Sequence, residues 1–431
     1  MKPVKIGLCG LGTVGSGVFN VLQRNAADIQ SRADCEITLS VVGARRDNPA
    51  CDLGATPVER DIFAVTTDPN VDIVVELIGG TSVAKDLVLS AIEHGKHVVT
   101  ANKALIAEFG DEIFAKAAQK GVTVAFEAAV AGGIPIIKSL KEGLAANKIE
   151  WLAGIINGTG NFILTEMGDK NRDFADVLKE AQDKGYAEAD PTFDVEGIDA
   201  AHKLVILASL AFAMPLQYDK VFTEGISQVE TKDIEYAKQL GYRIKHIGIA
   251  RKNAEGIELR VHPTLIPQKR LIANVDGVMN AVLVKGDAVG ATLYYGAGAG
   301  AEPTASAVVA DIVDIARQVS NNAKSAPALG FSQLTEQVIQ NIDDVTTAYY
   351  LRLSVLDKPG VLSQLTNILS GLNISIEAVN QPEPEEGATE AEVVLITGRT
   401  QEKNLLAAVQ SLETLDAVVG NIHKIRVETL G

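Results

Sequence analysis

A single stretch decides the fold of the N-terminal part of this chain: Val4-Lys-Ile-Gly-Leu-Cys9-Gly10-Leu-Gly12-Thr-Val-Gly15. Its first six residues predict a buried strand, and a G-x-G-x-x-G pattern follows directly, with an amphipathic helix expected over residues 13–25. Glycines at such a junction permit a tight turn and let the backbone approach a pyrophosphate at the helix N-terminus. The stretch therefore predicts a dinucleotide site, contacted by Gly10, Leu11, Gly12, Thr13, Val14 and Gly15.

Strands and helices alternate beyond this stretch. Apolar runs predict strands at 37–42, 73–76, 98–100 and 122–126, with helices at 83–94 and 104–120. Such alternation requires a parallel, doubly wound sheet, the α/β arrangement of a Rossmann domain. We assign residues 1–133 to this dinucleotide-binding domain.

The end of the second predicted strand bears on the choice of cofactor. It reads Gly43-Ala-Arg45-Arg46, where an NAD-binding domain usually carries a carboxylate for the ribose. Arg45 can instead pair with the 2′-phosphate of NADP, although a solvated basic turn would look the same. The sequence favours NADP(H), with NAD(H) as a second cofactor.

Composition limits the location and the partners of the chain. The 431 residues carry a formal charge of −16, which argues against nucleic acid or an anionic membrane as partner. Three cysteines without framework spacing suit a reducing cytosol. The longest mostly apolar run, residues 204–216, is shorter than the roughly 20 residues of a bilayer span. We expect a cytoplasmic protein.

The densest group of charges lies at residues 185–203, where five carboxylates and one lysine precede an apolar run. Asp199 and Lys203 are four residues apart, which places them on one face of a helix. An ordinary surface ion pair has the same spacing. A carboxylate this close can also orient a lysine for proton transfer.

This segment resembles the signature of homoserine dehydrogenases at every fixed position, from Ala181 through Asp190-Pro191 and Gly197 to Lys203. The resemblance implies an enzyme that interconverts L-homoserine and L-aspartate 4-semialdehyde in threonine, methionine and isoleucine biosynthesis. It implies Lys203 as proton donor and Asp199 as its orienting partner. Further residues implied at the site are Lys103 (catalysis, cofactor and substrate), Glu188, Asp194 and also Asp199 (substrate), and Gly185 and Gly300 (cofactor). We interpret the neighbouring His202 as a packing residue.

A glutamate and a loop of small residues, Glu127-Ala-Ala-Val-Ala-Gly-Gly-Ile-Pro135, follow the strand at 122–126. Free carbonyls in such a loop could suit a hard cation with oxygen ligands, or the glycines could simply turn the chain. The resemblance implies a sodium site with ligands at Glu127, Val130, Gly132 and Ile134.

Residues 134–322 are assigned to an α+β catalytic and dimerisation domain. Strands are expected at 152–157, 257–261, 281–285 and 291–295, and helices at 174–184, 195–213 and 304–321, the last packing back on the Rossmann domain. The resemblance implies a homodimer or homotetramer assembled through this block.

Residues 323–346 are polar and are interpreted as a linker, and residues 347–431 then read β-α-β-β-α-β. With Asp357-Lys-Pro-Gly360 after its first strand, this part resembles an ACT domain, a regulatory module that binds amino acids. Asp357, Gly360 and Asn373 are the expected effector residues, and L-threonine the expected effector. A ferredoxin-like domain that serves only assembly is the alternative. A truncation near residue 345 is expected to stay active.

Two other functions compete with the dehydrogenase. A non-catalytic amino-acid sensor on a decayed dehydrogenase scaffold should have lost a site residue, yet Lys103, Glu188, Asp199 and Lys203 are all present. A phosphorylating aspartate-semialdehyde dehydrogenase needs a nucleophilic cysteine, and the last cysteine is Cys51. The sequence therefore favours an NAD(P)-dependent oxidoreductase.

Overall fold

The computed structural model describes residues 3–49, 51–383 and 387–431. These form two compact units. The first contains Met1–Gly158, Asp199–Val221 and Val278–Gln337, and the second contains Thr159–Ile198, Phe222–Gly277 and Val338–Gly431. Within the described ranges, no helix combines the length and the apolar character that crossing a membrane requires.

A six-stranded parallel sheet forms the N-terminal part of the first unit, in the order β3-β2-β1-β4-β5-β6. The strands are β1 (Val4–Cys9), β2 (Ile37–Gly43), β3 (Val58–Glu59), β4 (Ile73–Glu76), β5 (His97–Thr100) and β6 (Val124–Ala125). β1 pairs with both β2 and β4, so the chain reverses its direction of travel across the sheet at β1. Ligands bind at such a switch point in doubly wound folds. The predicted fold class is confirmed here.

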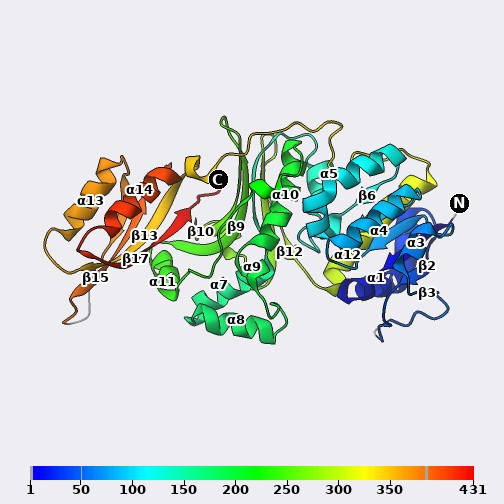
Figure 1. Cartoon of the computed structure of the whole chain (residues 1–431), viewed down its shortest axis with the longest axis horizontal. Helices are drawn as coiled ribbons and strands as arrows, with labels where there is room; N and C mark the ends of the chain where they lie inside the picture. Colours follow the sequence, from blue (N-terminus) through cyan, green and yellow to red (C-terminus); the bar gives the residue numbers. More distant parts are fainter. Residues whose placement is uncertain (1–2, 50, 384–386) are drawn as a thin grey trace. The chain divides into compact units, whose positions relative to one another are not determined.

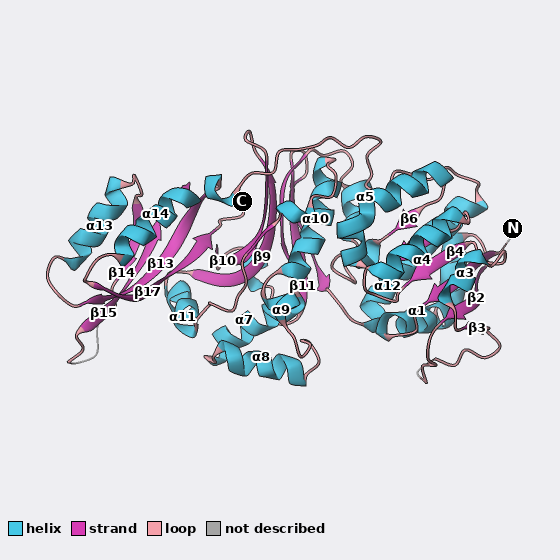
Figure 2. Cartoon of the chain, viewed as in Figure 1, coloured by secondary structure: helices cyan, strands magenta, loops and turns pink. Residues whose placement is uncertain are grey.

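Helices cover both faces of this sheet (Figure 2). One buried cluster joins the sheet to α1 (Thr13–Arg24), α2 (Ala26–Ala33) and α12 (Ala301–Ser320). The other joins it to α3 (Ile62–Thr67), α4 (Ser82–Glu93) and α5 (Lys103–Lys120). The strands read as nearly continuous apolar runs because both of their faces are buried.

The rest of the first unit contains three antiparallel strands and a buried helix. The strands are β7 (Ile149–Ile155), β11 (Met279–Gly286) and β12 (Gly290–Ala297), with β11 in the middle. Short elements are α6 (Ile136–Lys138), the 3₁₀ helices η1 (Glu127–Ala129) and η3 (Tyr218–Lys220), and the π-helix η2 (Ser139–Gly143).

The predicted helix 195–213 is wrong at its start. The chain forms a short α9 (Thr192–Val195) and then a separate α10 (Ile198–Phe212). Gly197 lies between them at φ +84°, in the left-handed region that ends a helix. The break places Asp199 in the first turn of α10, where the helix dipole favours a negative charge.

The second unit contains a sheet with the strand order β9-β10-β17-β13-β15-β14. Its strands are β9 (Tyr242–Lys252), β10 (Ile257–Pro267), β13 (Thr346–Leu356), β14 (Ile376–Asn380), β15 (Glu390–Thr397) and β17 (Val418–Val427), with short β8 (Phe222–Thr223) and β16 (Thr400–Gln401). Its helices and turns are α7 (Gly158–Lys170), α8 (Phe174–Asp183), α11 (Thr231–Gln239), α13 (Val361–Gly371), α14 (Glu402–Glu413), η4 (Leu271–Asn274) and η5 (Ile342–Asp344).

β10 is longer than the predicted strand 257–261 because Pro263 does not end it. β8 pairs with β10 only at Arg260 and Val261, and β17 pairs with it from Thr264 onward. Pro263 therefore falls between the segment of β10 that pairs with β8 and the segment that pairs with β17. A proline, which lacks an N–H group, costs no strand-pairing hydrogen bond at this position. β9, the antiparallel partner of β10, was not predicted.

The C-terminal part has the predicted order β13-α13-β14-β15-α14-β17 of an ACT domain, and α13 and α14 cover one face of its strands (Figure 1). Tyr349, Leu351 and Leu353 of β13 pack in one core with these helices. Tyr350, on the opposite face, belongs to a second core together with Phe162 and Leu265. The ACT strands thus share a core with residues far outside the ACT domain.

Candidate active site

Lys203 and Asp199 lie one turn apart on α10, and both are buried. The Lys203 ammonium donates to Asp199 Oδ2 at 2.7 Å and to the carbonyl oxygen of Ile156, just beyond the end of β7, at 2.7 Å. The pair is therefore no surface ion pair. Its lysine is held at a fixed place next to the loop that follows β7.

The Asp199 carboxylate also contacts a second lysine and a side-chain amide. Lys103 is the first residue of α5, and its Nζ lies 3.1 Å from Asp199 Oδ1. The Asn157 amide donates to Asp199 Oδ2 at 2.8 Å. Burial opposes ionisation of Asp199, but the charges of Lys203 and Lys103 and the hydrogen bonds from Lys203 and Asn157 outweigh it and hold its pKa at about 2. The site therefore has one ionised carboxylate between two ammonium groups.

His202 is directed to a different set of residues. Its Nε2 is 3.4 Å from Glu108 Oε1 on α5, and its ring centroid is 4.3 Å from that of Tyr218. Burial, followed by the charge of Lys103, lowers the pKa of His202 to about 4. At neutral pH it is an uncharged ring packed between α10 and these side chains.

A cleft of about 910 Å³ lies along the carboxyl ends of β1, β2 and β4. Its lining includes Gly10, Leu11 and Gly12 of the fingerprint and the loop Leu77-Ile-Gly-Gly80. A Cβ at Gly10 would collide with the Leu77 carbonyl oxygen. Gly12, the N-cap of α1, provides no side-chain cap, and a Cβ there would meet open space. This room beside a helix N-terminus fits a dinucleotide pyrophosphate.

Arg45 and Arg46 line the same cleft, together with Arg60 and Asp47. Arg60 donates to Asp47 Oδ1 at 2.7 Å and to the Ala44 carbonyl oxygen at 3.0 Å. Arg45 is exposed at the end of β2. The cleft thus brings the fingerprint and the arginine of the second strand together.

Glu127 is the first residue of the 3₁₀ helix η1 and is buried. Its carboxylate accepts the backbone N–H groups of Ile137 and Lys138, both at 2.8 Å, while its own N–H donates to Asp311 at 2.8 Å. Burial raises the pKa of Glu127, and burial together with the Glu127 charge raises that of Asp311 to about 7. Two buried carboxylates beside a carbonyl-rich loop are oxygen donors of the kind that hard cations prefer.

The loop after Glu127 contacts the glycine-containing loop at residues 296–300, which ends at the predicted cofactor residue Gly300. Ala131 and Gly132 have φ angles of +55° and +41°, and Gly133 N–H donates to the Ala297 carbonyl oxygen at 2.9 Å. Gly300, at φ +126°, is the N-cap of α12.

The remaining predicted substrate and cofactor residues belong to the second unit. Gly185 follows α8 at φ +73°, and Glu188 is exposed in the loop after it. Asp194 lies within α9 and is half-buried. The predicted effector residues also belong to the second unit. Asp357 follows β13 directly, Gly360 is the N-cap of α13 at φ +89°, and Asn373 follows α13 at φ +57°.

Family models match most of the chain. A model described as "Homoserine dehydrogenase, NAD binding domain" matches residues 10–127, one described as "Homoserine dehydrogenase" matches 135–313, and one described as "ACT domain" matches 349–414. This chain is 61% identical to the homoserine dehydrogenase of Pseudomonas aeruginosa and 55% identical to that of Neisseria gonorrhoeae. Each alignment covers 100% of both chains.

The chain belongs to the homoserine dehydrogenase family.

Solved structures agree. A homoserine dehydrogenase from Thiobacillus denitrificans is 58% identical with a TM-score of 0.94, covering 100% of this chain and 99% of that one. One from S. aureus is 32% identical with a TM-score of 0.76, covering 99% of each. The chain is therefore an NAD(P)-dependent oxidoreductase with a C-terminal ACT domain, and the sensor alternative receives no support.

Two carboxylates near the cluster of Lys103, Asp199 and Lys203 were missed in the sequence, Glu76 and Glu108. Glu76 ends the buried strand β4, and a carboxylate at the carboxyl end of an inner strand could have marked it. Glu108 was missed because it lies in the middle of an ordinary amphipathic helix, and only the packing of α5 brings it to His202.

Proposed function

We propose that Lys203 is the proton donor when this homoserine dehydrogenase family member reduces L-aspartate 4-semialdehyde, and the proton acceptor when it oxidises L-homoserine. The observation that carries this is the Lys203–Asp199–Lys103 cluster, in which Lys203 and Asp199 are buried and lie 2.7 Å apart, and in which the half-buried Lys103 lies 3.1 Å from Asp199. Asp199 orients Lys203 through one oxygen and holds Lys103 through the other. A nicotinamide cofactor supplies or accepts the hydride when bound.

Glu188 and Asp194 are proposed to recognise the substrate, with Glu188 holding its ammonium group. Glu188 supports this by being an exposed carboxylate, which binds a cation without a large desolvation cost. The test compares oxidation of L-homoserine with that of 4-hydroxybutanoate, which lacks the amino group. We expect Glu188→Gln to lower kcat/KM for homoserine by roughly 10²-fold and to leave the poor activity on 4-hydroxybutanoate unchanged. An equal loss on both compounds would remove Glu188 from ammonium binding.

The cleft is proposed to bind NADP(H) in preference to NAD(H), with Gly10 to Gly15, Lys103, Gly185 and Gly300 as further contacts. Arg45 supports this because it lines the same cleft as the fingerprint glycines.

Arg45→Ala is expected to weaken NADPH binding by about 1.5–3 kcal/mol, the scale of a hydrogen bond to a charged group, and to change NADH binding much less. Titration of both cofactors measures the difference, with Arg32→Ala, at an exposed arginine outside the cleft lining, as the control. Equal weakening of NADPH and NADH would show that Arg45 does not recognise the 2′-phosphate.

A sodium ion is proposed at Glu127 and the carbonyl oxygens of Val130, Gly132 and Ile134. The buried Glu127 carboxylate and the left-handed turn at residues 131–132 support it. Sodium chloride should raise the midpoint of thermal unfolding above that in choline chloride at equal ionic strength, and Glu127→Gln should abolish this difference. The same midpoint in both salts would argue against the site.

L-Threonine is proposed as the effector of the ACT domain, in a cytoplasmic homodimer or homotetramer. The exposed Asp357 and the positive φ angles of Gly360 and Asn373 support a backbone that can surround a small amino acid. Initial rates of homoserine oxidation with NADP and with NAD, with and without threonine, test the cofactor and the effector together.

A further inference from the structure

A carboxylate outside the lysine cluster connects two parts of the first unit. Glu76 ends β4 and is 0% exposed. Its Oε1 accepts the backbone N–H groups of Ile78 at 2.9 Å and Gly79 at 3.3 Å. Its Oε2 accepts the Thr100 hydroxyl at 2.6 Å. One oxygen therefore holds the loop after β4, and the other holds the end of β5.

The loop held by the first oxygen belongs to the cofactor cleft. Residues 77–80 line that cleft, and Gly79 and Gly80 have φ angles of +73° and +70°. Leu77 N–H donates to the Cys9 carbonyl oxygen at 2.8 Å, and the Leu77 carbonyl packs against Gly10 of the fingerprint. A displacement of the backbone of residues 77–80 would therefore also displace the fingerprint residues Cys9 and Gly10.

The second oxygen connects to Lys103 through two residues. Thr100 Oγ1 accepts the Asn102 N–H at 3.0 Å. Asn102 caps α5 by accepting the Leu105 N–H at 3.1 Å, and its amide donates to the Gly80 carbonyl oxygen at 2.6 Å. Lys103 is the next residue. The start of α5 is thus fixed to the cofactor loop by Thr100 on the buried side and by Asn102 on the outer side.

We propose that Glu76, Thr100 and Asn102 are positioning residues that fix Lys103 against Asp199 and tie its position to the cofactor loop. The inference rests on the proposed function, in which Asp199 holds Lys103 beside the proton donor Lys203 and Lys103 takes part in catalysis. Lys103 Nζ is 3.1 Å from Asp199, and a displacement of about 1 Å in a catalytic site can cost about 10²-fold in rate. The network acts on turnover through Lys103.

Thr100→Val removes the hydroxyl at nearly constant volume, and Thr100→Ser keeps it. We expect Thr100→Val to lower kcat for homoserine oxidation roughly 10- to 100-fold, with a smaller change in KM for homoserine because Glu188 and Asp194, the carboxylates proposed to recognise the substrate, are untouched. Thr100→Ser should stay within about threefold of the wild-type kcat. Asn102→Ser provides a second variant, because serine still caps a helix but cannot reach Gly80.

A double-mutant cycle with Lys103→Ala separates positioning from general loss of structure. In the Lys103→Ala enzyme, Thr100→Val and Asn102→Ser should lower kcat by less than about twofold further. Full additional losses in that background, or wild-type kcat in both single variants, would overturn the inference. If Thr100→Val does not fold, Asn102→Ser alone decides. Wild-type turnover by Lys103→Ala itself would reject the proposed role of Lys103, and the coupling with it.

Discussion

Asp199 is the residue on which the charges of the candidate site converge. Lys203, Lys103 and Asn157 all contact its carboxylate. A buried carboxylate is stable only when it is paired and hydrogen-bonded, so the two lysines are also what keeps it ionised. Removing either lysine alters the charge balance as well as the chemistry.

Lys203→Ala should lower kcat by at least about 10²-fold, the usual contribution of a positioned proton donor, while NADPH binding stays largely intact. Steady-state rates and cofactor titration measure the two effects. Lys220→Ala, at a lysine whose side chain is 57% exposed, is the matched control. Near-normal turnover by Lys203→Ala would remove it from the mechanism and make His202 the next candidate.

His202 gives the stability of the protein a defined pH dependence. Its pKa is lowered from 6.5 to about 4, so between these values the unfolded chain binds a proton that the folded chain does not. Stability should therefore be complete above pH 6.5 and fall as the pH decreases toward 4, by on the order of 3 kcal/mol. Chemical unfolding of wild type and His202→Asn across this range measures it. Parallel pH curves for the two proteins would contradict the assignment.

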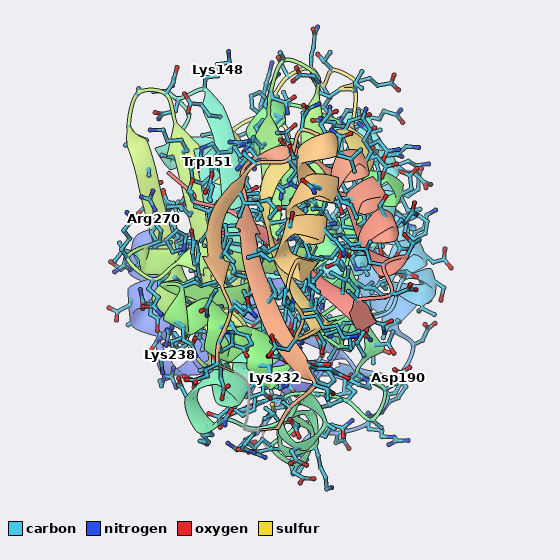
Figure 3. The ribbon with its side chains drawn as sticks, turned by 90° about the vertical axis from the view of Figure 1, so that its left-hand side faces the viewer. Lys148, Trp151, Asp190, Lys232, Lys238 and Arg270 are labelled. Carbon is cyan, nitrogen blue, oxygen red and sulfur yellow. The ribbon has the colours of Figure 1, made fainter. Side chains whose placement is uncertain are left out.

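At the scale of elements, α11 is bound to the ACT strands by charges. Arg352 of β13 donates to Asp233 at 2.7 Å and to Glu230 at 2.7 Å, and Tyr350 donates to Asp233 at 3.1 Å. Lys232, labelled in Figure 3, pairs with Glu392 of β15 at 2.7 Å. These contacts fix a helix that precedes β9 to the regulatory domain.

Arg352→Met should destabilise the protein by about 3–5 kcal/mol, because Asp233 stays buried without its charged partner. Lys232→Ala is the control, since the Lys232 side chain is 61% exposed and such pairs contribute about 0–1 kcal/mol. Urea unfolding followed by circular dichroism compares the two. Equal, small effects would show that Asp233 is solvated in solution.

At the scale of the whole chain, the structure changes the expectation for a truncation near residue 345. β17 pairs with β10. Glu428, just after β17, accepts a hydrogen bond from the guanidinium of Arg260, which is fully buried. Removing residues 346–431 would take away Glu428 and leave the buried Arg260 with Glu258 as its remaining acidic partner, and it would expose the core around Phe162 and Leu265. We expect the truncated chain to aggregate or unfold, although the cut falls in a polar segment.

Regulation is therefore better tested in the intact chain. Millimolar L-threonine should inhibit homoserine oxidation by the wild type, and Asn373→Ala should abolish inhibition while basal kcat changes less than about twofold. The effector must bind two states of the enzyme with different affinity to act in this way. An unchanged rate together with no binding heat for the wild type would reject threonine and favour another amino acid or a role in assembly.

The sequence by itself determined the local features. The G-x-G-x-x-G turn, the apolar strands of the parallel sheet and the Asp199–Lys203 spacing follow from neighbouring residues, because glycine conformation, burial on both faces and helical periodicity are local properties. For the same reason the order of the ACT strands and helices could be predicted from their alternation. The roles of the site residues and the exact domain boundaries remain predictions.

Only the tertiary structure decided which distant residues meet. Lys103 and Asp199 are 96 positions apart and Glu76 and Thr100 are 24 apart, and no local pattern encodes either contact. Gly197 separates α9 from α10, where the apolar periodicity of the sequence had predicted one continuous helix. The shared core of β10, β17 and β13 was hidden because residues 323–346 have the composition of a linker. Strand pairing and burial, which depend on the whole chain, made the regulatory domain part of a larger unit.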